Sequence, residues 1–236
     1  MNNTAITYLK FISNQIGQGI PLVDFHIHTN WTDGIHSVQE MYDAACELNL
    51  KCILFSEHAR KSSISWFRSF TSEVRALPKK PCRALVGVET RVIDFNGNIE
   101  IDNDIISLCD LVIGSVHRFP GKEGVPLQFN EVSQNEALEI EFKLAEKLLD
   151  NPSVEILGHP MGMCYSKYGI TIPDSKMYQL IEKAKIKGIA FEVNSKYSAD
   201  PLKYVKMCRN IGALISLGSD AHSKKEVGNI INVCKE

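Results

Sequence analysis

The stretch Asp24-Phe25-His26-Ile27-His28-Thr29 is the part of the chain around which the fold is organised, and Asp33 follows it closely. Apolar and polar residues alternate over Leu22–His28, which predicts a buried β-strand. Because side chains alternate between the two faces of a strand, the carboxylate and both imidazoles are expected to project to one side. Such a face is typical of a site for zinc, iron or manganese. An isolated pair of this kind is also typical of one core histidine and one loop histidine, so the interpretation depends on the rest of the chain.

Composition sets the broad class of the protein. The chain has 236 residues, of which 44% are hydrophobic and 23% charged, enough apolar material for a substantial core. The formal net charge of −2 predicts no general attraction to nucleic acid or to anionic membranes. Seven scattered cysteines without a Cys-x-x-Cys pair argue against a disulfide framework and a thiolate zinc site. No apolar run reaches membrane-spanning length and residues 1–19 lack the features of a secretory signal, so a cytoplasmic protein is expected.

Short apolar segments alternate with helical patterns along the whole chain, which is typical of parallel β/α units. The predicted strands are residues 22–28, 51–56, 83–88, 110–116, 154–157, 189–193 and 213–217. The predicted helices are residues 5–16, 38–48, 66–77, 131–149, 173–187, 200–208 and 224–234. The first helix belongs to an N-terminal segment, 1–20, and Asn96-Gly97 predicts an inserted hairpin over 91–101. We therefore expect one domain over residues 1–236, an α/β fold closed into a seven-stranded barrel, with a doubly wound open sheet as the alternative.

Most histidines and several acids follow the ends of predicted strands, where parallel β/α folds gather their functional groups. The histidines are His26, His28, His58, His117, His159 and His222. The acids are Asp33, Glu57, Glu89, Glu192 and Asp220. Without a cation, so many imidazoles and carboxylates would carry a large cost in desolvation and repulsion. The pattern predicts a metal site at the carboxyl-terminal rim of the strands, with His36 left outside it as a surface or capping residue.

Six short motifs, taken together, resemble the PHP family (polymerase and histidinol phosphatase), and the histidinol-phosphatase-like branch most of all. They are Asp24-Phe-His26-Ile-His28, Ser56-Glu57-His58, Gly87-Val88-Glu89, Ser115-Val116-His117, Gly158-His159-Pro160 and Ser219-Asp220-Ala221-His222. The resemblance extends in family order from the first predicted strand to just past the seventh. It implies a distorted (β/α)7 TIM-like barrel, in agreement with the strand count.

The resemblance also implies a centre of three divalent metal ions, zinc, manganese, iron or a mixture. The implied ligands of the first metal are His26, His28, Glu89 and Asp220. Glu89 would bridge to a second metal, which His117 and His159 complete. The implied ligands of the third metal are Asp33, His58 and His222. Some members of the family carry histidine in place of Asp33, so the acid is expected to affect metal preference.

The expected chemistry is attack on phosphorus by a hydroxide that bridges metals about 3.5–4 Å apart. His117, Asp220 and His222 are the expected catalytic residues, and His222 or a water on a metal would protonate the leaving oxygen. Fixed positive charge for the phosphate is expected first from Arg118 and then from Arg60 and Lys196.

The sequence thus favours a metal-dependent phosphatase acting on a small phosphomonoester. A phosphodiesterase or nuclease acting on nucleotides or nucleic-acid ends is the alternative, although no long basic stripe with interleaved aromatic residues is present. A metal-binding module without catalysis is disfavoured by the complete set of ligands. Glu192 and Asn194 share a strand face and are expected either to orient a ligand or to bond within the core. The sequence leaves the oligomeric state open.

Overall fold

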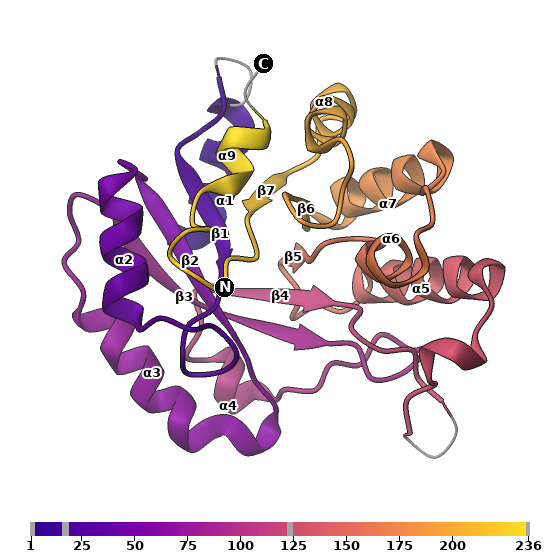
Figure 1. Ribbon diagram of the computed structural model, residues 1–236, viewed down its shortest axis with the longest axis horizontal. Coiled ribbons are helices and arrows are strands. Elements are labelled where there is room, and N and C mark those ends of the chain that lie inside the picture. The colour runs from indigo at the N-terminus through magenta and orange to yellow at the C-terminus, as the bar shows by residue number, and fades with distance from the viewer. Residues whose placement is uncertain (1–2, 16–18, 122–124, 235–236) are drawn as a thin grey trace.

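The sheet contains seven strands that follow one another in sequence order. The computed structural model describes residues 3–15, 19–121 and 125–234. Each strand pairs in parallel with the next along the chain, and the sheet curls so that its last strand returns towards the first (Figure 1). The strands are β1 (Val23–Ile27), β2 (Cys52–His58), β3 (Arg83–Arg91), β4 (Leu111–Ser115), β5 (Ile156–Leu157), β6 (Ala190–Asn194) and β7 (Ile215–Gly218).

The segment that follows β7 closes the barrel against β1. Ala221 forms a parallel bridge with Ile27. The His28 amide donates to the carbonyl of Ala221 at 2.8 Å, and the Ala221 amide donates to the carbonyl of His26 at 3.1 Å. A doubly wound sheet would reverse its strand order, which this sheet does not. The predicted distorted seven-stranded α/β barrel is confirmed, and the open sheet is wrong.

Helices lie around the outside of the barrel (Figure 1). They are α1 (Asn3–Gln15), α2 (Val38–Glu47), α3 (Ile64–Ala76), α4 (Asn103–Ile106), α5 (Gln134–Leu148), α6 (Gly162–Tyr168), α7 (Asp174–Lys187), α8 (Pro201–Ile211) and α9 (Asn229–Val233). Capping boxes begin two of them, Ser37 with Glu40 for α2 and Ser133 with Glu136 for α5. Among the described helices, none is both long and apolar enough to cross a membrane.

Helix α1 packs at the amino-terminal end of the barrel, opposite the strand ends that carry the histidines. Its Leu9 and Ile12 side chains are buried. The Ser13 hydroxyl accepts a hydrogen bond of 2.9 Å from the amide of Ile215, the first residue of β7. The carboxyl-terminal end of the barrel is therefore not covered by α1.

The structure departs from the predicted elements in a few places. Helices α4 and α6 were not predicted, and the last helix is shorter than expected, covering only Asn229–Val233. The predicted hairpin over residues 91–101 contains a single antiparallel bridge, between Val92 and Ile99. The predicted end of the first helix, at Ile16, lies outside the described residues. The single domain over residues 1–236 and the cytoplasmic location stay predictions.

Candidate metal centre

Imidazoles and carboxylates from all parts of the chain converge at the carboxyl-terminal mouth of the barrel. Parallel strands in register place their last residues side by side, and His58 at the end of β2 is the register partner of Glu89 in β3. The other side chains of the group come from β1 or from the loops that follow β1, β4, β5 and β7. They are His26, His28, Asp33, His117, His159, Asp220 and His222.

Glu89 occupies the middle of this group and is almost fully buried. Its Oε1 lies 3.0 Å from His117 Nε2 and 2.8 Å from His159 Nε2. Its Oε2 lies 3.2 Å from both His26 Nε2 and His58 Nδ1. His28 Nε2 lies 3.5 Å from the same Oε2. Burial alone would raise the pKa of Glu89, but the neighbouring His117 and His26 outweigh it and hold that pKa well below its usual range. A carboxylate with two imidazoles at one oxygen and three at the other is placed to bridge two cations.

His26 and His28 meet Asp220 on one side of Glu89. Asp220 Oδ1 lies 3.2 Å from His28 Nε2 and 3.6 Å from His26 Nε2. Both histidines are completely buried. Burial favours the neutral imidazole, but the neighbouring carboxylates of Asp220 and Glu89 outweigh it and raise the pKa of His28 to about 9. A bound cation would take the place of a proton between these acids and imidazoles.

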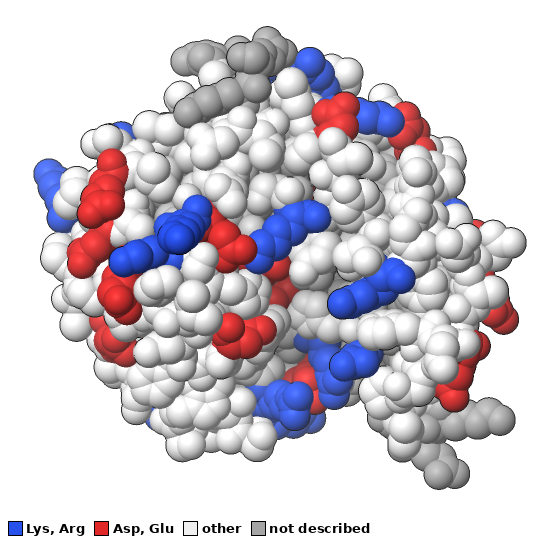
Figure 2. Space-filling model, viewed as in Figure 1, with Lys and Arg blue, Asp and Glu red and all other residues white. Residues whose placement is uncertain are grey.

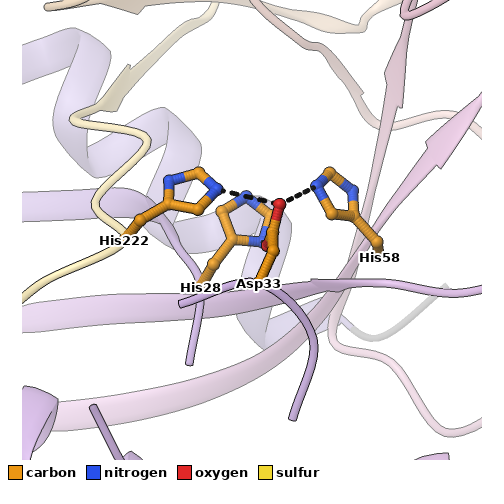
Figure 3. Close-up of side chains that lie close together, drawn as sticks. All are labelled: His28, Asp33, His58 and His222. Carbon is orange, nitrogen blue, oxygen red and sulfur yellow. Dashed lines mark ion pairs between the residues drawn. The ribbon is translucent and has the colours of Figure 1, made fainter. Parts of the chain in front are cut away.

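Asp33 brings three imidazoles together nearer the solvent (Figure 3). Its Oδ2 lies 3.3 Å from His222 Nε2 and 3.4 Å from His58 Nε2, and its Oδ1 lies 4.0 Å from His28 Nδ1. The hydrogen bonds from His222 and His58 hold the pKa of Asp33 well below its usual range. These four side chains form the largest of the described groups whose ligand atoms lie within 4.8 Å of one another.

The donor set fits divalent metal ions. Three further groups of ligand atoms lie within the same 4.8 Å limit: His26 with Glu89 and His159, His26 with His28 and Asp220, and His58 with Glu89 and His117. Several buried ring nitrogens make no well-aligned hydrogen bond: Nε2 of His26, both nitrogens of His28 and Nδ1 of His159. Carboxylate oxygens lie 3.2 Å from Nε2 of His26 and of His28, without hydrogen-bond geometry. A buried polar atom without a partner is costly, and imidazole nitrogen is a preferred ligand of zinc and iron. Cations bound here would satisfy these atoms.

Glu192 in β6 holds two of the candidate ligands in place. Its Oε1 accepts from His26 Nδ1 at 2.7 Å and from Asn194 Nδ2 at 3.0 Å, and its Oε2 accepts from the His159 amide at 2.5 Å. With Nδ1 bonded to a carboxylate, His26 directs Nε2 towards Glu89 and Asp220. Of the two roles left open by the sequence, the structure favours orientation of a ligand by Glu192.

Two acids that the sequence pattern placed in the group have other partners. Asp24 accepts from the amides of Ser219 at 2.9 Å and Gly228 at 2.8 Å, and burial raises its pKa to about 6. Glu57 accepts from the Thr29 amide at 2.7 Å and from the Thr32 hydroxyl, so it fixes the loop after β1. Neither belongs to any of the described groups of ligand atoms. The expectation that Asp24 shares the chelating face and that Glu57 joins the cluster is therefore wrong.

The backbone is strained at two candidate ligands. His159 has φ 25° and Asp220 has φ 50°, conformations that residues other than glycine rarely adopt. Gly218, just before this second turn, cannot carry a side chain, because a Cβ there would meet the Glu192 carboxylate and the Cβ of His26. Strain of this kind is typical of functional sites, where surrounding contacts over-determine the conformation.

An open cavity of about 830 Å³ lies above the candidate ligands. Figure 2 shows acidic groups inside a central hollow and basic side chains around its edge. The basic residues that line the cavity are Arg60, Arg91, Arg118 and Lys167. Arg91 pairs with Glu100 at 2.7 Å, and the Arg118 guanidinium lies 5.2 Å from the centre of the Phe129 ring.

Two of these cations were missed, and one predicted cation, Lys196, lies beside Asp220 and His222 without lining the cavity. Arg91 lies two residues beyond Glu89 in β3, so the period of the strand could have identified it. Lys167 lies on the unpredicted helix α6. Lys196 is not among the described residues that line the cavity. Its ammonium donates to the Asp220 carbonyl at 2.5 Å and lies 3.3 Å from the Glu226 carboxylate. His36 stays outside the group, half-buried, with Nδ1 accepting from the Lys224 amide at 3.3 Å.

Comparisons with known proteins agree with this geometry. A "Probable phosphatase" of Clostridium novyi (strain NT) is 28% identical over 219 residues, which cover 88% of this chain and 82% of that protein. The DNA polymerase/3'-5' exonuclease of Bacillus subtilis (strain 168) is 25% identical over 213 residues, which cover 85% of this chain and 34% of that longer protein. Histidinol phosphate phosphatase of Lactococcus lactis, solved with zinc, L-histidinol and phosphate, shares the fold with a TM-score of 0.65 at 18% identity, over 89% of each chain.

The family model described as "PHP domain" matches residues 24–196, from β1 to just beyond β6. This span includes seven of the nine candidate ligands, all except Asp220 and His222. Because the match extends over most of the chain, the protein belongs to the PHP domain family.

Proposed function

We propose that this chain is a metal-dependent phosphatase that hydrolyses a small phosphomonoester. The observation that carries the proposal is the convergence of nine ligand-competent side chains at one end of the barrel. Seven of them line a cavity whose edge carries guanidinium groups, and His26 and His28 lie buried beneath them. The names of its relatives support the reaction class, and the phosphate and L-histidinol in the Lactococcus lactis structure support a small phosphorylated substrate. Histidinol phosphate is the first compound to test.

We infer that the floor of the cavity holds three divalent ions, with zinc, manganese and iron as the candidates. The proposed ligands of the first are His26, His28, Glu89 and Asp220. Glu89 is shared with the second, which His117 and His159 complete. The proposed ligands of the third are Asp33, His58 and His222. When bound, such ions supply positive charge for phosphoryl oxygens and lower the pKa of water towards neutrality.

The chain's own residues bind and orient the substrate. Arg118 and Arg60 line the cavity and are proposed to form charge-assisted hydrogen bonds with the non-reacting phosphate oxygens. Arg118 is held over Phe129, which restricts its guanidinium and reduces the entropy lost on binding. Lys196, tied to the carbonyl of Asp220, is proposed to position that turn rather than to bind substrate.

The proposed catalytic residues are His117, Asp220 and His222, which all line the cavity. His117 Nε2 faces Glu89, and Asp220 Oδ1 faces His28. Both side chains are therefore placed to hold the attacking water and the phosphate group at the bottom of the cavity. The proton for the leaving oxygen comes from His222 or from a water in the cavity.

A phosphodiester is the second candidate substrate, because the Bacillus subtilis relative is named as an exonuclease. The cavity is open enough for the end of a short oligonucleotide. A phosphatase releases inorganic phosphate from a monoester, whereas a phosphodiesterase cleaves a diester to a monoester. One assay with both kinds of substrate therefore separates the two candidate functions.

The test is a panel of substrates offered to chelator-treated protein that is reloaded with Mn²⁺, Zn²⁺ or Fe²⁺. The panel contains histidinol phosphate, AMP and bis(p-nitrophenyl) phosphate. We expect phosphate release from one or both monoesters and little cleavage of the diester. Cleavage of the diester alone would overturn the phosphatase in favour of the phosphodiesterase. No cleavage of any compound by the metal-loaded, folded protein would favour a binding module.

A further inference from the structure

Two tryptophans line the cavity above the candidate metal ligands. Trp31 lies in the loop after β1, two residues before Asp33, and Trp66 lies in α3. Their rings are nearly parallel, with an interplanar angle of 19° and 6.0 Å between centroids, which is an offset stack. They are also the only tryptophans of the chain.

The indoles are held rigidly although each is only half-buried. Trp31 Nε1 donates to the Glu73 carboxylate at 2.7 Å, and its amide donates to the Thr29 hydroxyl at 3.3 Å. Trp66 packs edge-on against Phe67, at a centroid distance of 5.6 Å, and in a tilted contact against Phe70, at 6.5 Å. Large aromatic surface that is fixed in advance and still reaches a cavity is suited to binding, because little side-chain entropy is lost when a ligand covers it.

The cavity has room for more than a phosphate group. Its volume of about 830 Å³ lies within the range of small-molecule sites, roughly 300–1,000 Å³. Seven of the candidate metal ligands form its floor, and the cationic part of its lining is Arg60, Arg91, Arg118 and Lys167. The tryptophans share its apolar lining with Ala59, Phe129 and Met163, and their nearly parallel rings form an extended planar part of it. A charged or strongly hydrated group would not use this surface.

We propose that Trp31 and Trp66 form a stacking subsite for a planar aromatic ring carried by the leaving group of the substrate. The inference rests on the proposed function for the position of the phosphate over the floor of the cavity. It narrows the substrate class to phosphomonoesters of aromatic or heteroaromatic alcohols. The competing explanation is that the two rings only cover Phe70 and the outer surface of α3.

Tryptophan fluorescence excited at about 295 nm tests the subsite without any turnover, since the tyrosines absorb little there and these two residues are the chain's only tryptophans. The metal-loaded protein is titrated with 3-phenylpropylphosphonate and with 3-cyclohexylpropylphosphonate, in which carbon replaces the ester oxygen and hydrolysis cannot occur. The saturated ring is the more hydrophobic of the two, so simple burial favours it, whereas stacking favours the planar ring. We expect a saturable change in emission and an affinity at least about fivefold higher for the phenyl compound. Inorganic phosphate should leave the emission unchanged.

Variants then locate the contact. Trp31→Leu and Trp66→Leu keep an apolar side chain but remove the planar one, and each leaves a single reporter. We expect a loss of about 5- to 150-fold in affinity for the phenyl compound and little change for the cyclohexyl compound. Trp31→Phe and Trp66→Phe, which keep a planar ring, should retain much of the preference for the phenyl over the cyclohexyl compound. Tyr178→Leu, at an exposed aromatic residue of α7 outside the cavity, is the matched control and should change nothing.

Kinetics with 2-phenylethyl phosphate and 2-cyclohexylethyl phosphate separate this inference from the proposed function. Turnover of both esters with equal affinity for both phosphonates would refute the subsite and leave the phosphatase in place. Preferred binding of the phenyl phosphonate without turnover of either ester would support the subsite and refute the phosphatase. Failure of both binding preference and turnover would refute both.

Discussion

Replacing Glu192 with glutamine should weaken metal binding although this residue holds no metal itself. The substitution keeps the size of the side chain and removes its charge. In the wild-type protein the carboxylate accepts from His26 Nδ1, from the Asn194 side chain and from the His159 amide. Glutamine has only one acceptor oxygen. Its NH2 group would replace the second oxygen and would face an N–H donor of the wild-type site, so that hydrogen bond would be lost.

The size of the effect follows from burial and from the number of bonds lost. Glu192 is 2% exposed, so water cannot replace the missing acceptor. Hydrogen bonds to a charged group contribute about 1.5–3 kcal/mol each. Loss of a partner that orients a metal-binding histidine costs about 10- to 100-fold in metal affinity, or about 1.4–2.7 kcal/mol. We expect Glu192→Gln to lose this much affinity at the site that contains His26.

The assay is competition for Zn²⁺ with a chromophoric chelator at pH 7.5, with circular dichroism to confirm folding. Glu141→Gln is the matched control, because Glu141 is equally buried and accepts from two amides, those of Met163 at 3.0 Å and Cys164 at 2.6 Å. The control should leave zinc affinity within about twofold of the wild type. Wild-type zinc affinity in folded Glu192→Gln, or an equal loss in both variants, would refute the reasoning.

Three further predictions concern single side chains. His117→Ala should lower kcat/KM for the best monoester by more than about 100-fold with the fold intact, because His117 faces Glu89. His36→Ala should keep nearly the wild-type kcat/KM, because His36 lies outside the group of candidate ligands. Equal activity of the two variants would contradict the proposed site. Arg118→Ala should raise KM, with kcat/KM about 10- to 150-fold lower, and the exposed Arg68→Ala should not; an unchanged KM would remove Arg118 from the substrate contacts. Burial raises the pKa of Glu141 to about 7 from 4.5, so its contribution to folding stability is full below about pH 4.5 and is lost as pH rises through 7. Between pH 4.5 and pH 8 the free energy of unfolding of Glu141→Gln, measured with urea, should therefore rise by about 3 kcal/mol relative to that of the wild type. An equal pH dependence of unfolding in the two proteins would show that this carboxyl does not titrate in that range.

The barrel was predictable because each strand is a short apolar run followed by a polar strand end. Its closure was predicted from the number of strands, but the contact that closes it, the bridge between Ala221 and Ile27 beyond the last strand, was not. Helix α6 was missed for a related reason. It begins after Met161 at φ 64°, without a capping side chain that sequence analysis could recognise.

The candidate ligands were predictable because each follows a strand end, but the sequence does not show how deep a side chain lies along the barrel axis. Asp24 shares a face of β1 with His26, yet lies two residues and roughly 6.6 Å further into the barrel, where amides surround it. Glu57 precedes His58 by one residue and so points to the other face of β2. The opposite orientation of Glu57 and His58 could therefore have been predicted from the two-residue period of a strand. The position of Lys196 behind Asp220 depends on a turn with positive φ, which the residue types do not indicate.

The most direct test of the account is phosphate release from histidinol phosphate by chelator-treated protein, measured as Mn²⁺, Zn²⁺ or Fe²⁺ is added back. The account predicts no release from the metal-free protein, and a rate that rises with bound metal and saturates when the ligand groups around Glu89 and Asp33 are filled. Full activity without metal would contradict it. So would metal-loaded, folded protein that releases phosphate from neither histidinol phosphate nor any other monoester.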